Sequence, residues 1–199
     1  LKANGARNSA VGGWQAPLGI ELYADGLSAW MLLISAILGT ATAVYASRYF
    51  EDRGSHFWPC WLLMTAAVNA LFLARDIFTF YVTLELIGLS SVAMIALSDK
   101  RDALAAALRY FFVSMLGSLC YLLGVALLYG TFSTVDIDGL RAVMTDSPSA
   151  LVAGGLMTVG LLLKTALFPM HFWLPPAHAN APAPVSALLS GLVVKASFY

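Results

Sequence analysis

The sequence predicts an all-α fold, a polytopic bundle of membrane-spanning helices. Of the 199 residues, 60% are hydrophobic and only 11% are charged, and the mean hydropathy is +0.79. A soluble domain is usually about 45–50% apolar and about 25% charged. The apolar residues also form several runs near the roughly 20 residues that a helix needs to cross a bilayer. Charged segments separate these runs, which is typical of a membrane protein and not of a soluble core.

The expected elements follow one another along the chain. Residues 1–26 are polar and rich in glycine, so we expect an extramembrane loop or a surface strand there. A transmembrane domain is expected over residues 27–199. It would hold five full spans and a truncated sixth, at about 27–46, 57–74, 77–97, 103–129, 149–167 and 184–199. None of these runs alternates with period 2, which argues against the strands of a membrane barrel.

The chain has the features of an internal fragment of a longer protein. Leu1 is not a start methionine, and no signal peptide opens the sequence. The last apolar run, which begins at Pro184, stops at Tyr199 without a polar flank. We therefore expect that the complete protein has further spans.

The basic residues that flank the spans indicate an orientation. They divide into a group of five on one side, Arg48, Arg53, Lys100, Arg101 and Arg109, and a group of four on the other, Lys2, Arg7, Arg75 and Arg141. The positive-inside rule favours the cytoplasm for the larger group. The formal net charge is zero, so there is no electrostatic basis for binding nucleic acid.

The sequence contains no motif that would hold a cofactor or a metal. Cys60 and Cys120 both lie inside apolar runs, without the spacing of a disulfide framework or a metal site. Neither a glycine-rich phosphate loop nor a CxxC motif is present. We therefore predict no cofactor and no catalytic or redox centre in this chain. Whether it belongs to an enzyme complex stays open, and any redox reaction would belong to partner subunits.

Three ionisable residues lie inside the apolar runs: Glu85 in YVTLELIGL, Lys164 in GLLLKTALF and Lys195 in GLVVKASFY. A charge at the bilayer centre costs at least about 2.5–3.5 kcal/mol, so such residues mark ion or proton paths. At about 1.5 Å per residue, they lie roughly 12, 22 and 12 Å from the outer edge. A lysine whose carboxylate partner moves away becomes able to release its proton near neutral pH. The set predicts a proton relay, and a static ion pair that fixes helix register is the alternative.

A stretch rich in proline and histidine, FPMHFWLPPAHANAPAPVSA, follows the fifth span. Proline lacks an N–H and disfavours a helix before it, so the span must end or break near Phe168. Broken helices commonly build ion sites in transporters. His171 and His178 could pass protons there, because histidine titrates near physiological pH. The alternative is an ordinary loop with histidines at the membrane interface.

Two smaller features accompany the buried charges. Ser114, Gly117 and Gly124 fall near one face of the fourth span, which we interpret as a face for close helix packing. Tyr81 precedes Glu85 by one helical turn and lies within reach of a hydrogen bond to it.

These residues together resemble the antiporter-like subunits of respiratory complex I, membrane-bound hydrogenases and the multisubunit (Mrp-type) Na⁺/H⁺ antiporters. The resemblance rests on FTFYVTLELIGLSSVAMIAL, on LLLKTALFPMHFWLPPAHANAPAPVSALLSG and on Lys195, and covers nearly the whole chain. The early segment GIELYADGLSAWMLLISAILG is most similar to the antiporter's D-type polypeptide. Some complex I subunits carry a histidine near the position of Ser190 and no later lysine, so the other subtypes fit better.

The resemblance implies a fold and a function. The chain would hold most of one five-helix inverted repeat, with a proline-broken helix. Glu85 would pair with Lys164, and Lys195 would be the next station of the relay, beside His171 and His178. The protein would translocate protons, with Na⁺ transport left open, among other membrane subunits and lipid in the cell membrane of a bacterium. The alternative is a non-conducting structural subunit whose buried charges hold helices together.

Overall fold

A computed structural model describes residues 7–14, 19–50, 56–98 and 100–199. Lys2 and Arg53, which entered the orientation prediction, lie outside the described residues. So do parts of the expected N-terminal loop, namely residues 1–6 and 15–18. The described part of that segment forms a small antiparallel hairpin of β1 (Arg7–Ala10) and β2 (Glu21–Ala24).

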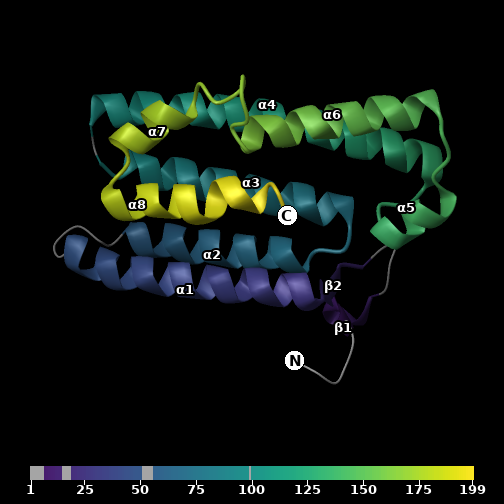
Figure 1. Cartoon of the computed structure of the whole chain (residues 1–199), viewed down its shortest axis with the longest axis horizontal. Coiled ribbons are helices and arrows are strands. Elements are labelled where there is room, and N and C mark those ends of the chain that lie inside the picture. Colours follow the sequence, from purple (N-terminus) through teal and green to yellow (C-terminus); the bar gives the residue numbers. More distant parts are fainter. Residues whose placement is uncertain (1–6, 15–18, 51–55, 99) are drawn as a thin grey trace.

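Most of the rest of the described chain is helical, which confirms the predicted membrane helix bundle. The helices are α1 (Gly26–Tyr49), α2 (Phe57–Leu73), α3 (Ile77–Ala96), α4 (Arg101–Phe132), α5 (Ile137–Val143), α6 (Pro148–Lys164), α7 (Leu174–Asn180), α8 (Ala183–Leu188), the π-helical turn η2 (Leu189–Val193) and α9 (Val194–Ala196). The long helices run side by side along the molecule (Figure 1). Among the described residues, α1, α3 and α4 are long and apolar enough to cross a membrane, and α2, α6 and residues 183–196 are shorter apolar helices.

The end of the bundle that carries the hairpin is also where several helices begin. Figure 1 shows β1, β2 and α5 at this end and α7 at the other. Asp25, Asp76 and Asp136 accept backbone N–H bonds at the starts of α1, α3 and α5, and Ser147 does the same for α6. Such caps satisfy N–H groups that have no partner within the helix. The bond from the Ser28 N–H also lowers the pKa of Asp25.

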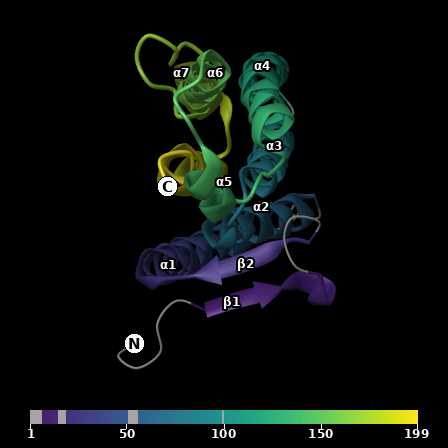
Figure 2. The same ribbon diagram turned by 90° about the vertical axis from the view of Figure 1, so that its right-hand side faces the viewer.

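Helices α4 and α6 pack closely because small residues face each other. Figure 2 shows α6 beside α4, above the layer of α1 and α2. A Cβ placed on Gly160 would lie 2.5 Å from the Gly117 carbonyl oxygen, and one on Gly124 would lie 2.7 Å from the Ala153 carbonyl oxygen. The backbones therefore approach to distances that only glycine permits. Since Lys164 lies one turn beyond Gly160, this packing holds the lysine against α4.

Replacing Gly160 by alanine is expected to destabilise the protein, because the nearest atom to the new methyl group belongs to backbone and cannot rotate away. Overpacking of this kind costs about 1–3 kcal/mol. The measurement is the thermal denaturation midpoint of the full-length protein in detergent. Gly154→Ala on the same helix is the matched control, since a Cβ there meets nothing within 4 Å. Equal midpoints for the two variants would contradict the role given to this contact.

The expected break after the fifth apolar run is present, and it begins before the first proline. Helix α6 ends at Lys164, and Ala166 adopts a left-handed conformation with φ 52°. Trp173 then fills the space beside the break, where it is 1% exposed, and its Nε1–H donates to the Leu163 carbonyl at 2.9 Å. The Trp173 ring stacks on Tyr110 of α4 with centroids 4.4 Å apart. The indole N–H thus bonds to the Leu163 carbonyl, which would accept a helical backbone N–H if the helix continued.

Candidate functional site

The structure brings Glu85 of α3 and Lys164 of α6 together inside the bundle. The Lys164 Nζ lies 3.4 Å from Glu85 Oε1. The lysine side chain is 6% exposed, whereas the glutamate side chain is 24% exposed. The lysine is therefore almost fully enclosed by this chain, and the glutamate keeps part of its surface open toward the outside of the chain.

Two serines of α4 complete the surroundings of this pair. Lys164 Nζ donates to Ser114 Oγ at 3.0 Å and to the Leu84 carbonyl at 3.4 Å. One turn further along α4, Ser118 Oγ donates to Glu85 Oε1. Neither role was predicted from the sequence, where Ser114 was assigned to packing and Ser118 was not considered. The signal that could have found them is their spacing of four residues, which puts both on one face of a helix.

No hydrogen bond joins Tyr81 to Glu85 among the described residues, so the expected partner of the glutamate is replaced by Ser118. The Tyr81 ring instead lies against Phe78, with centroids 5.9 Å apart. Glu85 is therefore held from the neighbouring helix rather than from its own.

The remaining predicted relay residues lie apart from the pair. His178 of α7 shares a hydrogen bond of 2.8 Å between its Nδ1 and Ser186 Oγ. Lys195 of α9 is exposed and donates to the Ser190 carbonyl at 3.0 Å, within the π-helical turn η2. The charge of Lys195 acts on His178, so these two residues form a second electrostatic group. Among the described residues, no hydrogen bond or ion pair connects this group to Glu85 or Lys164.

His171 occupies a different environment from His178. It is exposed on the turn between α6 and α7, where its ring lies 5.6 Å from the ring of Phe168. His178 thus interacts electrostatically with Lys195, whereas His171 lies at the surface of the chain.

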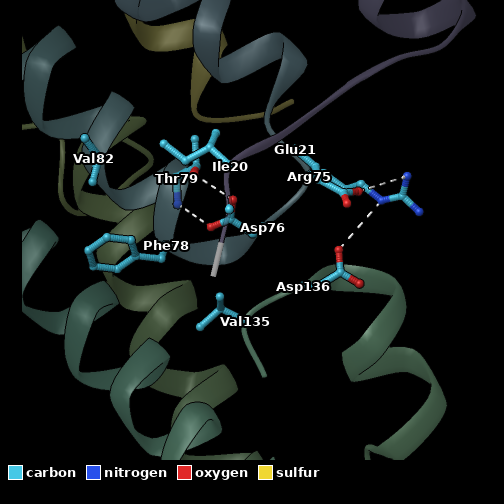
Figure 3. A pocket seen from close by; sticks show the side chains of 10 residues that line it. Ile20, Glu21, Arg75, Asp76, Phe78, Thr79, Val82, Val135 and Asp136 are labelled. Carbon is cyan, nitrogen blue, oxygen red and sulfur yellow. Dashed lines mark hydrogen bonds and ion pairs between the residues drawn. The ribbon is translucent and has the colours of Figure 1, made fainter. Parts of the chain in front are cut away.

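A cluster of charges at the hairpin end of the bundle was not predicted. Arg75 forms ion pairs with Asp138 at 2.5 Å, Asp136 at 3.7 Å and Glu21 at 3.9 Å. Its guanidinium also lies 5.1 Å from the centre of the Tyr23 ring. Figure 3 shows Glu21, Arg75 and Asp136, which come from different segments, around a cavity of about 230 Å³. Arg75 thereby ties the hairpin and α5 to the turn between α2 and α3.

Within the described part of the chain, no group of three or more histidine, cysteine, aspartate or glutamate side chains is placed to hold a metal ion. The candidate residues form an ion pair with hydroxyl partners, and a histidine that interacts electrostatically with a lysine. Both can take up and release protons.

Comparison with known proteins relates this arrangement to a family. The family model described as NADH:quinone oxidoreductase/Mrp antiporter, TM matches residues 74–199. The N-type polypeptide of the NADH-quinone oxidoreductase of Desulforudis audaxviator is 38% identical over 197 residues, covering 95% of this chain and 39% of that protein. The D-type polypeptide of the Na⁺/H⁺ antiporter of Alkalihalophilus pseudofirmus is 29% identical, covering 98% of this chain and 41% of that protein. Relatives from both complexes thus match, and the chain spans about two fifths of their length.

Solved structures agree with this assignment. The Mrp complex from Dietzia sp. superposes with a TM-score of 0.88 at 31% identity, covering 98% of this chain and 37% of that chain. The membrane-bound sulfane sulfur reductase, an archaeal respiratory membrane complex, gives a TM-score of 0.86 at 29% identity, covering 96% of this chain and 40% of that chain. The chain therefore belongs to the NADH:quinone oxidoreductase/Mrp antiporter transmembrane family and is an integral, multi-pass membrane protein.

Proposed function

We propose that the chain is the part of an antiporter-like subunit that moves protons across the membrane, in a multisubunit complex of the Mrp or complex I type. The observation that carries this proposal is the ion pair of Glu85 and Lys164, at 3.4 Å in the interior of the bundle. A buried pair of this kind stores and releases a proton when its partners separate, because each charge stabilises the charged form of the other.

The geometry of the pair favours a proton relay over a static ion pair that only fixes the register of the helices. When an ammonium donates a hydrogen bond directly to a carboxylate, the nitrogen and oxygen atoms usually lie about 2.7–2.9 Å apart. Here the ammonium is closer to Ser114 Oγ, at 3.0 Å, than to Glu85 Oε1, at 3.4 Å. Lys164 is thus shared between a hydroxyl and a carboxylate. An ammonium shared in this way can leave the carboxylate without losing every partner.

The second group gives the proton a place to go within this chain. His178 and Lys195 interact through their charges, next to the hydroxyl of Ser186. We assign the order Glu85 and Lys164 first, then His178 and Lys195, with water bridging the groups in the assembled protein. His171 stays a prediction as a relay residue. The driving reaction, whether redox or ion exchange, would come from partner subunits.

Replacing Glu85 by glutamine tests this function, because the amide keeps the shape of the side chain and cannot ionise. We expect proton flux to fall to background while the complex assembles as before. Flux is measured with a pH-sensitive dye in inverted membrane vesicles that carry the full-length protein in its complex, and assembly on native gels. Asp102→Asn is the control, because Asp102 is an exposed carboxylate in the first turn of α4. Normal flux in Glu85→Gln would refute the proposal.

A non-conducting structural role is the second candidate, and the buried position of Lys164 is what favours it. Breaking a buried ion pair destabilises a protein by about 3–5 kcal/mol when the other charge remains. On this hypothesis, Glu85→Gln would lose assembly on native gels, and any complex that did form would show normal flux. The two measurements made together separate the candidates.

A further inference from the structure

We propose that Ser114 and Ser118 are positioning residues that set the protonation of the Glu85–Lys164 pair from opposite sides. This inference rests on the proposed function and assigns roles to two further residues of the same site. The serines are buried, at 6% and 2% exposure, and lie one turn apart on the face of α4 that meets α3 and α6. Each hydroxyl contacts a different member of the pair.

The two hydroxyls act on opposite charges. Ser118 donates to Glu85 Oε1, and a donor to a carboxylate favours its ionised form. Ser114 accepts from the Lys164 ammonium, and an acceptor for an ammonium favours its protonated form. Both serines therefore stabilise the charged state of the pair, each through its own partner.

Ser114 and Ser118 bond across helices to charged side chains, whereas the buried Ser35 bonds across helices to the neutral Asn69 at 3.0 Å. Buried serines in membrane helices usually bond to a carbonyl of their own helix, as Ser90 does with Leu86 and Ile87 at 2.8 and 3.0 Å. Ser114 and Ser118 bond across helices to side chains, with separations of 50 and 33 residues along the sequence. Helix packing alone does not require this, since alanine would pack equally well at such positions.

The close packing of α4 holds the serines at their partners. Gly88 of α3 faces Ser114, and a Cβ there would lie 2.8 Å from Ser114 Oγ. Gly117 lies between the two serines in sequence and touches α6, where a Cβ would lie 3.0 Å from the Gly160 carbonyl oxygen. The site therefore has glycine at two positions where a side chain would press on Ser114 or on the part of α6 that carries Lys164.

Other ionisable groups near the site are the same in every variant compared. The helices that carry the site and those packed against them hold further ionisable residues, namely Tyr81 on α3, Arg101, Asp102, Arg109, Tyr110, Cys120, Tyr121 and Tyr129 on α4, Cys60 on α2 and His178 on α7. Tyr110 interacts electrostatically with Glu85, but tyrosine ordinarily titrates near about 10. His178 and Lys195 interact with each other. Differences between serine variants therefore report on Glu85 and Lys164.

The test is the pH profile of proton flux by the full-length protein in its complex, in inverted vesicles. If flux needs the charged pair, it falls on the acid side as Glu85 takes up a proton, and on the alkaline side as Lys164 loses one. We expect Ser118→Ala to move the acid limb up by about one pH unit, and Ser114→Ala to move the alkaline limb down by about one unit. Ser90→Ala is the matched control and should move neither limb, since Ser90 is as buried as Ser118, at 2% exposure.

Conservative variants keep the test decisive. Ser118→Thr retains the hydroxyl and should restore the original acid limb. Ser118→Cys keeps the size but donates weakly, so it should shift the limb as alanine does and replaces Ser118→Ala if that variant does not assemble. If the acid and alkaline limbs of the pH profile stay in place in the serine variants, whether or not the rate of flux falls, Ser114 and Ser118 are not positioning residues. If Glu85→Gln abolishes flux in the same vesicles, the proposed function stands despite that failure.

Discussion

Replacing Lys164 by alanine is expected to abolish proton flux while the complex still assembles. The change removes the only ammonium that contacts Glu85 in the described structure. The Glu85 carboxylate, 24% exposed, can then take up a proton and become neutral. The penalty of about 3–5 kcal/mol for a buried charge left unpaired is thereby largely avoided. Flux is measured by dye quenching in inverted vesicles, and assembly on native gels.

The matched control is Lys100→Ala, which removes an exposed lysine just before α4 and should leave flux unchanged. Exchanging the charges, with Glu85→Lys and Lys164→Glu in one protein, adds a second test. We expect this double variant to assemble but not to conduct, because the carboxylate then lies on α6 and the ammonium on α3, the reverse of their order in the proposed relay. Restored flux in the exchanged protein would count against the relay and in favour of simple charge compensation.

The largest loss of stability is expected from Trp173→Ala. The indole is 1% exposed, stacks on Tyr110 and donates to the Leu163 carbonyl at 2.9 Å. Removing a fully buried tryptophan costs about 3–5 kcal/mol. The measurement is the free energy of unfolding of the full-length protein in detergent. Trp30→Ala on α1 is the control, because Trp30 is 63% exposed within the chain.

Trp173→Phe separates the two contributions of the indole. The phenyl ring can still stack on Tyr110, but the Leu163 carbonyl loses the indole donor and keeps only the longer bond from the Ala166 N–H at 3.4 Å. Losing one hydrogen bond of this kind costs about 0.5–1.5 kcal/mol. We expect a stability between those of the wild type and the alanine variant. A phenylalanine variant as unstable as the alanine variant would mean that the hydrogen bond, and not the ring contact, holds the break together.

The residues were sufficient to predict the helix bundle and to single out Glu85, Lys164 and Lys195, whereas the pairing of Glu85 with Lys164 came from the resemblance to the antiporter-like family. Long apolar runs and the cost of burying Glu85 and Lys164 are properties of the residues themselves. The roles of Ser114 and Ser118 could not be predicted in this way. A serine in a membrane helix bonds to its own helix or to a neighbour, and the choice depends on which helix packs against it.

Two other features depend on contacts between distant segments. Proline predicted a break near Phe168, but α6 ends at Lys164, because Ala166 turns the backbone and Trp173 takes the Leu163 carbonyl. The Arg75 cluster joins residues from the hairpin, the turn before α3 and the region of α5. No local pattern links residues that lie so far apart in the chain.

The bond from Trp173 to Leu163 has a mechanical consequence. Leu163 immediately precedes Lys164, and one turn earlier Gly160 packs α6 against α4. The last turn of α6 is thus held by packing at Gly160 at one end, and at the other end it is hydrogen-bonded to the segment that leads into α7. A displacement of α7 would be transmitted to the lysine ammonium and would change its distance from Glu85. On the proposed function, such a displacement would open or close the Glu85–Lys164 pair by moving the end of one helix, without rearranging the bundle.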